Sequence, residues 1–530
     1  MPINETCGQS AIAFLEAHGV DTVFGIPGVH TLDFYRGLAN SRIRHVGVRH
    51  EQGAGFMADG YARASGKPGV CVLITGPGVV NAGTAIGQAF SDSVPMLVLS
   101  SVNSSDDLGK GRGRLHEITD QQAVMAPLTA FSRTIQKPDE LSQAMADAYA
   151  VFETGRPRPV HIEIPIDVLA GPGVAAVDTR GRRQRPRAKK ADLAAAARLI
   201  DSAKRFVVIA GGGAIDAGEA LRNFVEKSGA VLMPTVAGRG TVPDDHPQSL
   251  AGTMAQTATQ EFLGKADLVL AVGSELAETD HWTKRLPIDG KLIRIDLDPR
   301  TLMRDYKPDV AILADAGETL LALTSLIAKR LAPDAKALAA VRSANLAEWP
   351  ALQLKHVKVL DALRASLPDD GIVASDMTQI AYTGCCHFIC RRPRTWFHPQ
   401  GFGTLGYALP AAIGAKIARP ERAVVALAGD GGLLFTVQEI ATAAELGLPL
   451  AILLWNNDAL GQIANDMDRL GISEVGVKPR NPDFQALARA FHCHAVRPES
   501  LAGLTQALKD AFKADRPTLI EVHESDAYLN

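Results

Sequence analysis

The stretch AVVALAGDGGLLFTVQEIATAAELGLPLAILLWNN, residues 423–457, decides the fold of this chain. It holds two unbroken apolar runs, 423–428 and 450–455, which are typical of strands buried on both faces of a parallel sheet. Between them lies an Ala-rich helical segment that Gly447 and Pro449 close. The stretch therefore predicts a strand-helix-strand unit whose two strands are parallel neighbours joined by a right-handed crossover.

Polar residues follow both strands of this unit. Gly429-Asp430-Gly431-Gly432 comes directly after the first strand, and Asn456-Asn457 follows the second. Because parallel strands end at the same edge of a sheet, we expect Asp430 and Asn457 to lie at the edge where such sheets bind ligands. Glycine amides beside a helix start favour a diphosphate, and one carboxylate with one amide oxygen suits Mg²⁺. The alternative is an ordinary glycine turn, since short glycine motifs are common.

The start of the helix in this unit is predicted from Thr436 and Glu439. These residues stand three positions apart, which is the spacing of a capping box. We therefore expect the helix to begin there and residues 429–432 to form a turn ahead of it.

Length and composition restrict the class of protein. The chain has 530 residues and 46% hydrophobic residues, which is enough for several domain cores. Its net charge of −3 gives no global attraction for nucleic acid or an anionic membrane. No apolar run approaches the roughly 20 residues of a membrane span, and residues 1–10 lack a signal-peptide pattern. We expect a cytoplasmic enzyme that binds neither nucleic acid nor a membrane.

Three units with alternating strand and helix patterns divide the chain. We place them at residues 1–170, 191–345 and 355–530, each with a doubly wound parallel sheet. Residues 171–190 form a linker with seven basic residues. We interpret this run as a solvated linker rather than a nucleic-acid patch, because no aromatic residues interleave with the charges.

Further motifs carry a resemblance that covers nearly the whole chain. The opening stretch resembles the diphosphate-binding motif of thiamine diphosphate (ThDP) enzymes, and other segments resemble acetohydroxyacid synthase signatures in the same order. These segments are Arg49-His50-Glu51-Gln52-Gly53-Ala54-Gly55, residues 58–63, Gly76-Pro77-Gly78 with Asn81, and Gly403-Thr404-Leu405-Gly406-Tyr407. The resemblance implies the ThDP-binding fold, with an N-terminal pyrimidine-binding (PYR) domain, a central Rossmann-like domain and a C-terminal diphosphate-binding (PP) domain.

The same resemblance assigns roles to individual residues. Glu51 takes the place of the activating glutamate that hydrogen-bonds N1′ of the cofactor; the alternative is an acid that offsets a helix dipole. Asp430, Asn457 and the carbonyl of Ala459 take the places of the Mg²⁺ ligands, and Leu405 that of the apolar support under the bent cofactor. The other implied cofactor contacts are Pro27, Pro77, Asn81, Gln379, Gly403, Gly429, Gly431, Gly432 and Gly461.

The central unit carries a weaker glycine motif. Gly211-Gly212-Gly213 resembles part of a dinucleotide fingerprint, but Asp216 stands where the last glycine belongs, and no second feature supports a nicotinamide dehydrogenase. In acetohydroxyacid synthases the corresponding domain binds FAD, whereas residues 273–282 depart from the family's flavin segment, so FAD is doubtful here. Ile380 likewise stands where the family has a diphosphate-contacting histidine.

The substrate pocket departs from that of biosynthetic acetohydroxyacid synthases. His116 stands in Leu-His-Glu where those enzymes have Phe-Gln-Glu, and Asp466 replaces their substrate-selecting tryptophan. A carboxylate suits a guanidinium, although an exposed loop aspartate is the alternative. We assign His30, His116, Gln462 and Asp466 to the pocket. Together with residues 25–32 and 111–117, these departures resemble 5-guanidino-2-oxopentanoate (2-ketoarginine) decarboxylases.

We therefore predict that the chain decarboxylates a 2-oxo acid with ThDP and Mg²⁺, converting 5-guanidino-2-oxopentanoate to 4-guanidinobutanal and CO₂. An acetolactate synthase that joins two pyruvates is the alternative. A ThDP-fold binding protein without turnover is a third reading, which the presence of Glu51, Asp430 and Asn457 disfavours. The resemblance also implies a homodimer or a dimer of dimers (a homotetramer), because the cofactor of this family lies between domains of two subunits.

Overall fold

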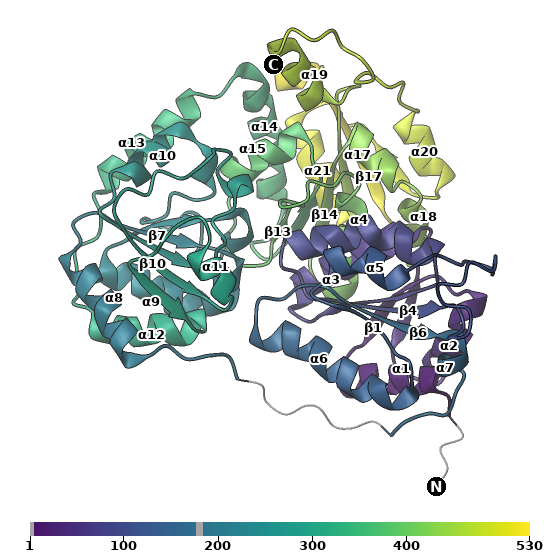
Figure 1. Cartoon of the computed structure of the whole chain (residues 1–530). Coiled ribbons are helices and arrows are strands. Elements are labelled where there is room, and N and C mark those ends of the chain that lie inside the picture. Colours follow the sequence, from purple (N-terminus) through teal and green to yellow (C-terminus); the bar gives the residue numbers. More distant parts are fainter. Residues whose placement is uncertain (1–4, 176–183) are drawn as a thin grey trace.

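The computed structural model describes residues 5–175 and 184–530 and arranges them in three α/β lobes, each built on a sheet with parallel strands only (Figure 1). Part of the predicted linker at 171–190, including Arg180, Arg182 and Arg183, lies outside the described residues. The predicted fold class, three doubly wound parallel-sheet domains, is confirmed.

The first sheet has the strand order β2-β1-β3-β4-β6-β5. Figure 1 shows α3, α4 and α5 on one face of this sheet and α1 and α6 on the other. The strands are β1 (Thr22–Gly25), β2 (Arg44–Gly47), β3 (Gly69–Leu73), β4 (Met96–Val102), β5 (Ser132–Thr134) and β6 (Val160–Pro165). The helices are α1 (Cys7–Ala17), η1 (Val29–Thr31), α2 (Leu32–Leu38), α3 (Glu51–Ser65), α4 (Pro77–Ser91), α5 (Gln121–Met125), α6 (Leu141–Thr154) and α7 (Ile166–Leu169).

The central sheet has the order β11-β10-β9-β7-β8. Its strands are β7 (Phe206–Ala210), β8 (Val231–Pro234), β9 (Leu268–Val272), β10 (Lys291–Asp296) and β11 (Val310–Leu313). The main helices are α8 (Lys190–Ser202), η4 (Gly212–Ala217), α9 (Gly218–Ser228), α10 (Thr257–Gly264), α11 (Pro299–Met303), α12 (Ala316–Leu326) and α13 (Ala335–Ala347).

The third sheet has the order β13-β12-β14-β15-β17-β16. Its strands are β12 (Ile372–Ser375), β13 (Trp396–Phe397), β14 (Val424–Gly429), β15 (Ala451–Asn456), β16 (His494–Val496) and β17 (Thr518–His523). The helices are α14 (Ala351–Ser366), α15 (Gln379–His387), α16 (Ala408–Ala418), α17 (Asp430–Phe435), α18 (Glu439–Glu445), α19 (Gly461–Arg469), α20 (Phe484–Ala490) and α21 (Leu501–Ala511). β14 pairs with β15 in parallel, with Gly429 opposite Trp455, as the sequence predicts.

Each sheet changes its winding direction next to its first strand. The first strand of each sheet is followed by a neighbour on one side and then by a neighbour on the other, which places the switch points between β1 and β3, β7 and β9, and β12 and β14. Loops at the carboxyl ends of the two strands diverge there and leave room for a ligand. The three switch points are therefore the places to look for functional residues.

The helical part of the β14–β15 unit differs from the prediction. α17 begins at Asp430, directly after the strand, so the glycine turn is itself the first turn of a helix. The Thr436 hydroxyl donates to the Gly406 carbonyl at 2.8 Å, and the Glu439 carboxylate accepts backbone N–H groups just ahead of α3. The predicted capping box is therefore wrong, because both side chains bond to distant parts of the fold instead.

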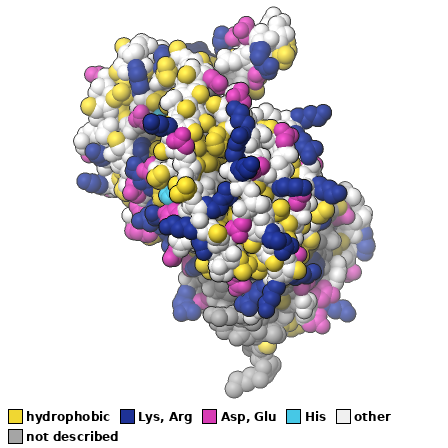
Figure 2. Space-filling model, turned by 90° about the vertical axis from the view of Figure 1, so that its left-hand side faces the viewer, with side chains coloured by type: hydrophobic (Ala, Val, Ile, Leu, Met, Phe, Trp, Pro, Cys, Tyr) yellow, Lys and Arg dark blue, Asp and Glu magenta, His cyan; other side chains and the backbone are white. Residues whose placement is uncertain are grey.

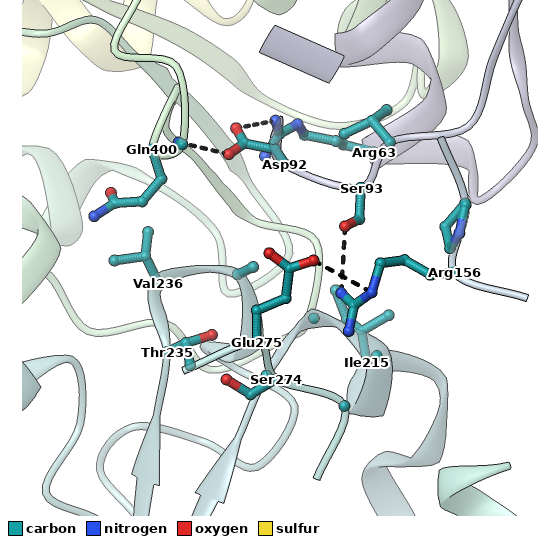
Figure 3. Close-up of a pocket in the computed structure, with 18 of the residues that line it drawn as sticks. Arg63, Asp92, Ser93, Arg156, Ile215, Thr235, Val236, Ser274, Glu275 and Gln400 are labelled. Carbon is teal, nitrogen blue, oxygen red and sulfur yellow. Dashed lines mark hydrogen bonds and ion pairs between the residues drawn. The ribbon is translucent and has the colours of Figure 1, made fainter. Parts of the chain in front are cut away.

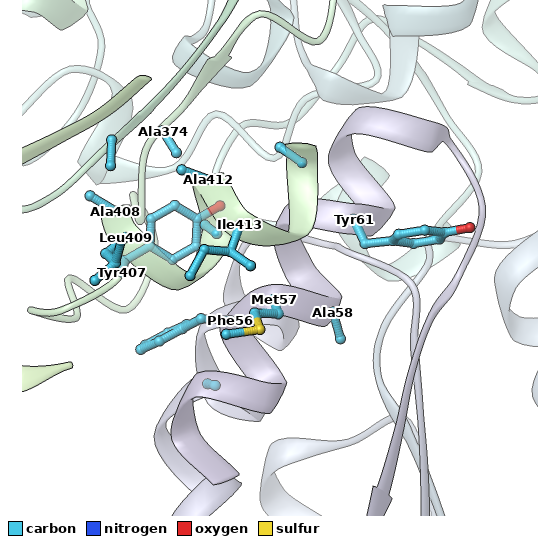
Figure 4. Close-up of a cluster of buried hydrophobic side chains, with 14 of the residues drawn as sticks. Phe56, Met57, Ala58, Tyr61, Ala374, Tyr407, Ala408, Leu409, Ala412 and Ile413 are labelled. Carbon is cyan, nitrogen blue, oxygen red and sulfur yellow. The ribbon is translucent and has the colours of Figure 1, made fainter. Parts of the chain in front are cut away.

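The first and third lobes share one hydrophobic core, centred on α3 and α16 (Figure 4). Glycine lets the two helices touch: a Cβ on Gly60 would lie 2.0 Å from the Ala411 carbonyl oxygen, and a Cβ on Gly414 would lie 1.9 Å from that of Met57. The Tyr407 hydroxyl, inside this core, donates to Asp59 Oδ1 at 2.6 Å. Glu51 therefore begins a helix that is tightly packed between the two lobes.

The surface gives two further results. Within the described ranges, no helix is long and apolar enough to cross a membrane. On the face drawn in Figure 2, basic and acidic side chains are intermixed, in keeping with the net charge of −3.

Candidate active site

The predicted site residues form two groups at two switch points. Pro27, His30, Glu51, Pro77, Asn81 and His116 belong to the first lobe; Gln379, Gly403, Leu405, the Gly429–Gly432 turn, Asn457, Ala459, Gly461, Gln462 and Asp466 belong to the third. In the part of the chain that the structure describes, no hydrogen bond links Glu51 to Asp430 or Asn457. We call the two groups half-sites, because they belong to different lobes.

Glu51 is a buried carboxylate at the first position of α3. Its Oε2 accepts a hydrogen bond from Asn81 Nδ2 at 3.0 Å, which joins two residues that the sequence assigns to the cofactor. A Cβ on Gly78 would lie 3.3 Å from Oε1, so glycine leaves room beside this oxygen. One oxygen of the carboxylate is therefore oriented by an amide, and the other faces a glycine.

Glu439 fixes the chain just ahead of Glu51, a role that the sequence did not reveal. Its fully buried carboxylate accepts backbone N–H groups of Arg49 and His50, each at 3.0 Å, and the Thr442 hydroxyl at 2.7 Å. Burial raises the pKa of Glu439, and these donors oppose the increase. The third lobe thereby positions the start of α3.

His30 and His116 lie together beside the same switch point. Their rings meet edge to face with centroids 5.3 Å apart, and each Nδ1 atom is buried without a hydrogen-bond partner among the residues described. Burial, and then the neighbouring His116, lowers the pKa of His30. The His116 backbone lies against Gly76, where a Cβ would be 2.4 Å from its carbonyl oxygen; α4, which carries Asn81, starts at the next residue. The histidine pair and Glu51 therefore share one edge of the first sheet.

Two predicted contacts of the first lobe are exposed. Pro27 lies in the loop after β1, and Pro77 is the first residue of α4. The Gly76 N–H donates to Gln121 Oε1 at 2.7 Å, and Gln121 was not predicted because its partner lies 45 positions away in the chain. This bond holds the loop between β3 and α4, where Pro77 begins the helix.

Asp430 is 3% exposed at the carboxyl end of β14. Its Oδ2 accepts a hydrogen bond from Asn481 Nδ2 at 2.7 Å, and the same amide lies 3.2 Å from Asp458 Oδ1. Burial raises the pKa of Asp430, and the Asn481 amide opposes this increase. No sequence signal marked Asn481, which comes from the segment ahead of α20.

Asn457 meets three of the predicted site residues. Its Nδ2 donates to Gln379 Oε1 at 3.3 Å, and its Oδ1 accepts the Ala459 N–H at 3.3 Å. At Gly461, a Cβ would lie 2.6 Å from both Asn457 Nδ2 and Gln379 Oε1. A larger residue at the start of α19 would displace both side chains, and these four residues form one cluster.

Asp376, which was not predicted, connects the loops of the third switch point. It follows β12, is 1% exposed, and accepts the backbone N–H groups of Met377 at 2.9 Å and Gly406 at 3.0 Å. Burial raises the pKa of Asp376 to about 6. A Cβ on Gly432 would lie 2.8 Å from Asp376 Oδ2. Asp376 thus holds the loop that carries Leu405 against the start of α17.

The backbone of that loop depends on glycine. Gly403 and Gly406 have φ values of +67° and +82°, which favour glycine, and Leu405 lies half-buried between them. Ile380, by contrast, is fully buried in the core beneath the site.

Gln462 and Asp466 lie on α19, a helix with no buried residue. Gln462 Nε2 donates to Asp466 Oδ2 at 3.3 Å, and the Arg469 guanidinium lies 3.1 Å from Asp466 Oδ1. The Asp466 side chain is 41% exposed. Asp466 therefore already pairs with a guanidinium, that of Arg469, which the sequence did not indicate.

The oxygen atoms around Asp430 and Asn457 suit a hard cation. No cluster of three or more His, Cys, Asp or Glu within the described ranges could hold a metal, so a cation here would also need amide, carbonyl or ligand oxygens. Mg²⁺ commonly binds in this way, with one or two protein oxygens beside phosphate and water. Within the described part of the chain, Asn481 Oδ1 is buried next to Asp430 without a partner, which leaves an oxygen for a cation or for its bound water.

Three family models match segments that contain these half-sites. The N-terminal TPP binding domain of thiamine pyrophosphate (TPP, or ThDP) enzymes matches residues 5–124, the central domain matches 193–323, and the C-terminal TPP binding domain matches 376–522. The chain belongs to the thiamine pyrophosphate enzyme family. Glu51 falls in the first TPP binding domain, and Asp430 and Asn457 fall in the second, which supports ThDP as the cofactor of this TPP enzyme.

Curated relatives extend over almost the whole chain. A probable 2-ketoarginine decarboxylase of Pseudomonas aeruginosa is 53% identical over 530 residues, which cover 98% of this chain and 94% of the relative. The large subunit of acetolactate synthase isozyme 1 of Escherichia coli is 32% identical and covers 98% of this chain and 93% of its own length. A probable acetolactate synthase large subunit of Methanocaldococcus jannaschii is also 32% identical, over 97% of this chain and 91% of its own. The predicted family is confirmed.

Proposed function

We propose that this TPP enzyme decarboxylates 5-guanidino-2-oxopentanoate to 4-guanidinobutanal and CO₂, with ThDP and Mg²⁺ bound. The observation that carries the proposal is the 53% identity, over 98% of the chain, to a probable 2-ketoarginine decarboxylase. Identity to acetolactate synthases is 32%. Synthesis of acetolactate from two pyruvates is therefore the second candidate.

Glu51 would activate the cofactor. When bound, ThDP supplies a sink for the electron pair left behind when a 2-oxo acid loses CO₂. Glu51 would hold N1′ of the pyrimidine ring and exchange a proton with it. Asn81 orients the carboxylate, and Glu439 is a positioning residue that fixes the backbone ahead of it.

Asp430, Asn457 and the carbonyl of Ala459 would hold Mg²⁺, and the backbone of Gly431 and Gly432 would lie beside the diphosphate. Asn481 keeps the Asp430 carboxylate in place through its 2.7 Å hydrogen bond. Gln379 does the same for the Asn457 amide. An anionic diphosphate with its cation would complete an oxygen set that the protein alone leaves incomplete.

The histidine pair supports release of an aldehyde. The carbon that loses CO₂ must gain a proton before an aldehyde can leave. His30 and His116 have buried, unpartnered ring nitrogens beside the Glu51 half-site, and an imidazole can deliver a proton near neutral pH. Acetohydroxyacid synthases have glutamine in place of His116, and an amide has no ionisable proton.

Asp466 would bind the guanidinium of the substrate. Asp466 already forms an ion pair of this kind with the guanidinium of Arg469, since a planar guanidinium matches a carboxylate well. Gln462 lies on the same helix and donates to the same carboxylate. We propose that substrate and Arg469 compete for Asp466.

Two copies of the chain would bring the half-sites together, as a cytoplasmic homodimer or a dimer of dimers. Both half-sites carry exposed apolar side chains, which are typical of surfaces that a partner covers. They are Val29, Leu32, Val80 and Leu115 in the first lobe, and Phe435, Ile463, Leu470 and Val475 in the third.

The function is tested with purified protein, ThDP and Mg²⁺, given 5-guanidino-2-oxopentanoate or pyruvate. We expect CO₂ and 4-guanidinobutanal from the guanidino acid and little turnover of pyruvate. Acetolactate from pyruvate, without turnover of the guanidino acid, would establish the second candidate instead. Hydrogen exchange at C2 of the bound cofactor gives an independent readout, since a binding protein without turnover would not accelerate it.

His116→Gln separates the two outcomes within one scaffold. We expect this variant to keep exchange at C2 but to release aldehyde about 100-fold more slowly, because the loss of a general acid commonly costs 10²–10⁴-fold in rate. Unchanged aldehyde release would remove His116 from the proton transfer, whichever substrate is used.

A further inference from the structure

A cavity of about 300 Å³ lies where the three lobes meet (Figure 3). The loops at the carboxyl ends of β7, β8, β9 and β10 form one side. The first lobe contributes residues 91–95 and Arg156, and the third contributes residues 394–401. The cavity lies at the switch point of the central sheet, where a doubly wound fold binds ligands, and the proposed decarboxylation does not use it.

The backbone around this cavity does not suit the diphosphate of FAD. The N–H groups of Gly211, Gly213 and Ala214 already donate to chain carbonyls at 2.9–3.0 Å. A Cβ on Gly211 would lie 2.2 Å from the Gly273 carbonyl oxygen, so the loops after β7 and β9 pack directly on each other. The chain continues as the 3-10 helix η4, and α9 begins only at Gly218. A dinucleotide site instead needs free amides at the start of an α-helix.

The arginines that line the cavity do not suit an anion either. Each one, as far as the structure describes the lining, is paired with at least one carboxylate. The pairs are Arg63 with Asp59 and Asp92, Arg156 with Glu275 and Asp296, Arg185 with Asp315, Arg239 with Asp244, and Arg394 with Asp216. A diphosphate would have to displace these carboxylates, so FAD does not fit this cavity.

Three acceptor side chains of the lining, by contrast, have fewer donors among the described residues than they can accept, although Arg156 Nε and Trp396 Nε1 are also buried without a hydrogen-bond acceptor there. Asp280 forms no ion pair with any described residue, and its Oδ1 accepts only the Val236 N–H, at 3.3 Å. Gln400 Oε1 is buried and has no hydrogen-bond partner among the residues that the structure describes. Glu275 Oε1 accepts a hydrogen bond from Arg158 at 2.6 Å and forms an ion pair with Arg156 Nε at 3.3 Å, while no described donor reaches its other oxygen. Figure 3 shows Glu275 extending toward Arg156, with Gln400 entering from another segment.

We propose that this cavity binds a small organic cation with several N–H donors, of the guanidinium or ammonium type, and that it does not bind FAD. The cation would pair with Asp280 and donate to Gln400 and Glu275. Charge-assisted hydrogen bonds of this kind are the strong ones, and a guanidinium offers five donors in a rigid fork. The volume lies at the lower end of the range for ligand pockets, which suits a small molecule.

Binding would stabilise the arrangement of the three lobes. Asp280 and Glu275 come from the central lobe, Gln400 from the third, and Arg156, which bonds Glu275, from the first. A ligand that binds only this arrangement stabilises it by RT ln(1 + c/Kd), where c is the ligand concentration, so the stabilisation grows with the logarithm of that concentration. Burial raises the pKa of Asp280 to about 7, and the nearby carboxylates of Asp92 and Glu275 add to the increase. A bound cation would oppose this increase, because a nearby positive charge favours the ionised form of a carboxyl group.

The test is calorimetric titration of the holoenzyme with agmatine, a guanidinium compound that is not a 2-oxo acid. We expect one site per chain that Asp280→Asn weakens by about tenfold or more, since a hydrogen bond to a charged group contributes about 1.5–3 kcal/mol. FAD and ADP should not bind, and the purified enzyme should show no flavin absorption. Co-purified flavin, or binding of FAD, would overturn the proposal.

Two controls separate this cavity from other sites. Asp245→Asn removes the same charge at an exposed position paired with Arg391 and should leave agmatine binding unchanged. Asp466→Asn tests the proposed substrate pocket: binding lost there but kept in Asp280→Asn would overturn the cavity site without affecting the proposed function. Gln400→Met is a second cavity variant, expected to weaken agmatine binding in the same direction. Turnover of the 2-oxo acid by Asp280→Asn should equal that of the unmodified enzyme.

Discussion

Two glycine turns follow buried strands at switch points of this molecule, and their surroundings differ. Gly429-Asp430-Gly431-Gly432 leads directly into the α-helix α17, with Asp376 and Asn481 around it. Gly211-Gly212-Gly213 leads into the 3-10 helix η4, and its amides are bonded to the chain itself. The first turn leaves the Asp430 carboxylate and the Asn481 amide oxygen for a bound group. The second turn packs directly against the loop after β9. A glycine turn after a strand therefore indicates a ligand only when its neighbours leave polar groups free.

The largest expected difference comes from the acidic residue of each turn. Asp430→Asn should lower turnover and Mg²⁺ affinity by at least about 100-fold. Even substitution of a residue that only hydrogen-bonds a metal ligand typically lowers metal affinity or activity about 10–100-fold. Asp216→Asn, in the other turn, removes only an ion pair whose carboxylate is 67% exposed and should leave both unchanged. Steady-state rates over a range of Mg²⁺ concentrations measure this. Similar losses in both variants would remove the distinction between the turns.

Glycine itself should matter more in the first turn. Gly432→Ala would place a Cβ 2.8 Å from the buried Asp376 Oδ2, and overpacking of this kind costs about 1–3 kcal/mol. Gly212→Ala would meet only the Ala237 Cβ, at 3.2 Å, and should cost less than about 0.5 kcal/mol. Urea unfolding of the two variants compares the costs directly, and equal costs would contradict the assignment.

The cavity beside the second turn should respond to pH through Asp280. Its pKa is raised to about 7 in the folded protein, above the ordinary value of 3.8, so the folded state holds the proton more tightly. The enzyme therefore loses stability as pH rises from about 4 to about 7, and Asp280→Asn does not share this loss. We expect the variant to be more stable by about 4 kcal/mol above pH 7 and equal to the enzyme near pH 4, since each unit of pKa shift corresponds to about 1.4 kcal/mol. Unfolding free energies at several pH values measure the difference; a constant difference would contradict it.

The smallest effect is expected outside both turns, on α19. Asp466→Asn should raise the KM for the guanidino acid about threefold to fivefold, because the carboxylate is 41% exposed and exposed pairs contribute about 1 kcal/mol or less. The kcat and KM for a 2-oxo acid with an uncharged side chain should be the same in the variant and the enzyme. An equal change for both substrates would place Asp466 outside the pocket.

The sequence predicted the parts of this molecule that depend on local pattern. The apolar runs at 423–428 and 450–455 form β14 (Val424–Gly429) and β15 (Ala451–Asn456), each within one residue of the predicted bounds. The family followed from motifs that are continuous in the chain. The capping box failed for the opposite reason: Glu439 has the right spacing from Thr436, but the backbone N–H groups that its carboxylate accepts lie 389 and 390 positions away.

By itself, the sequence determined three parallel sheets, the strand ends at which Glu51, Asp430 and Asn457 stand, and the family, because apolar runs and glycine turns act over a few residues. Only the tertiary structure decided which neighbours those residues have. Asp376 and Asn481 around the first glycine turn, the His30–His116 pair, and the closure of the second turn all depend on loops from separate strands meeting at one sheet edge. That meeting is set by strand order and helix packing across hundreds of residues, which no local pattern encodes.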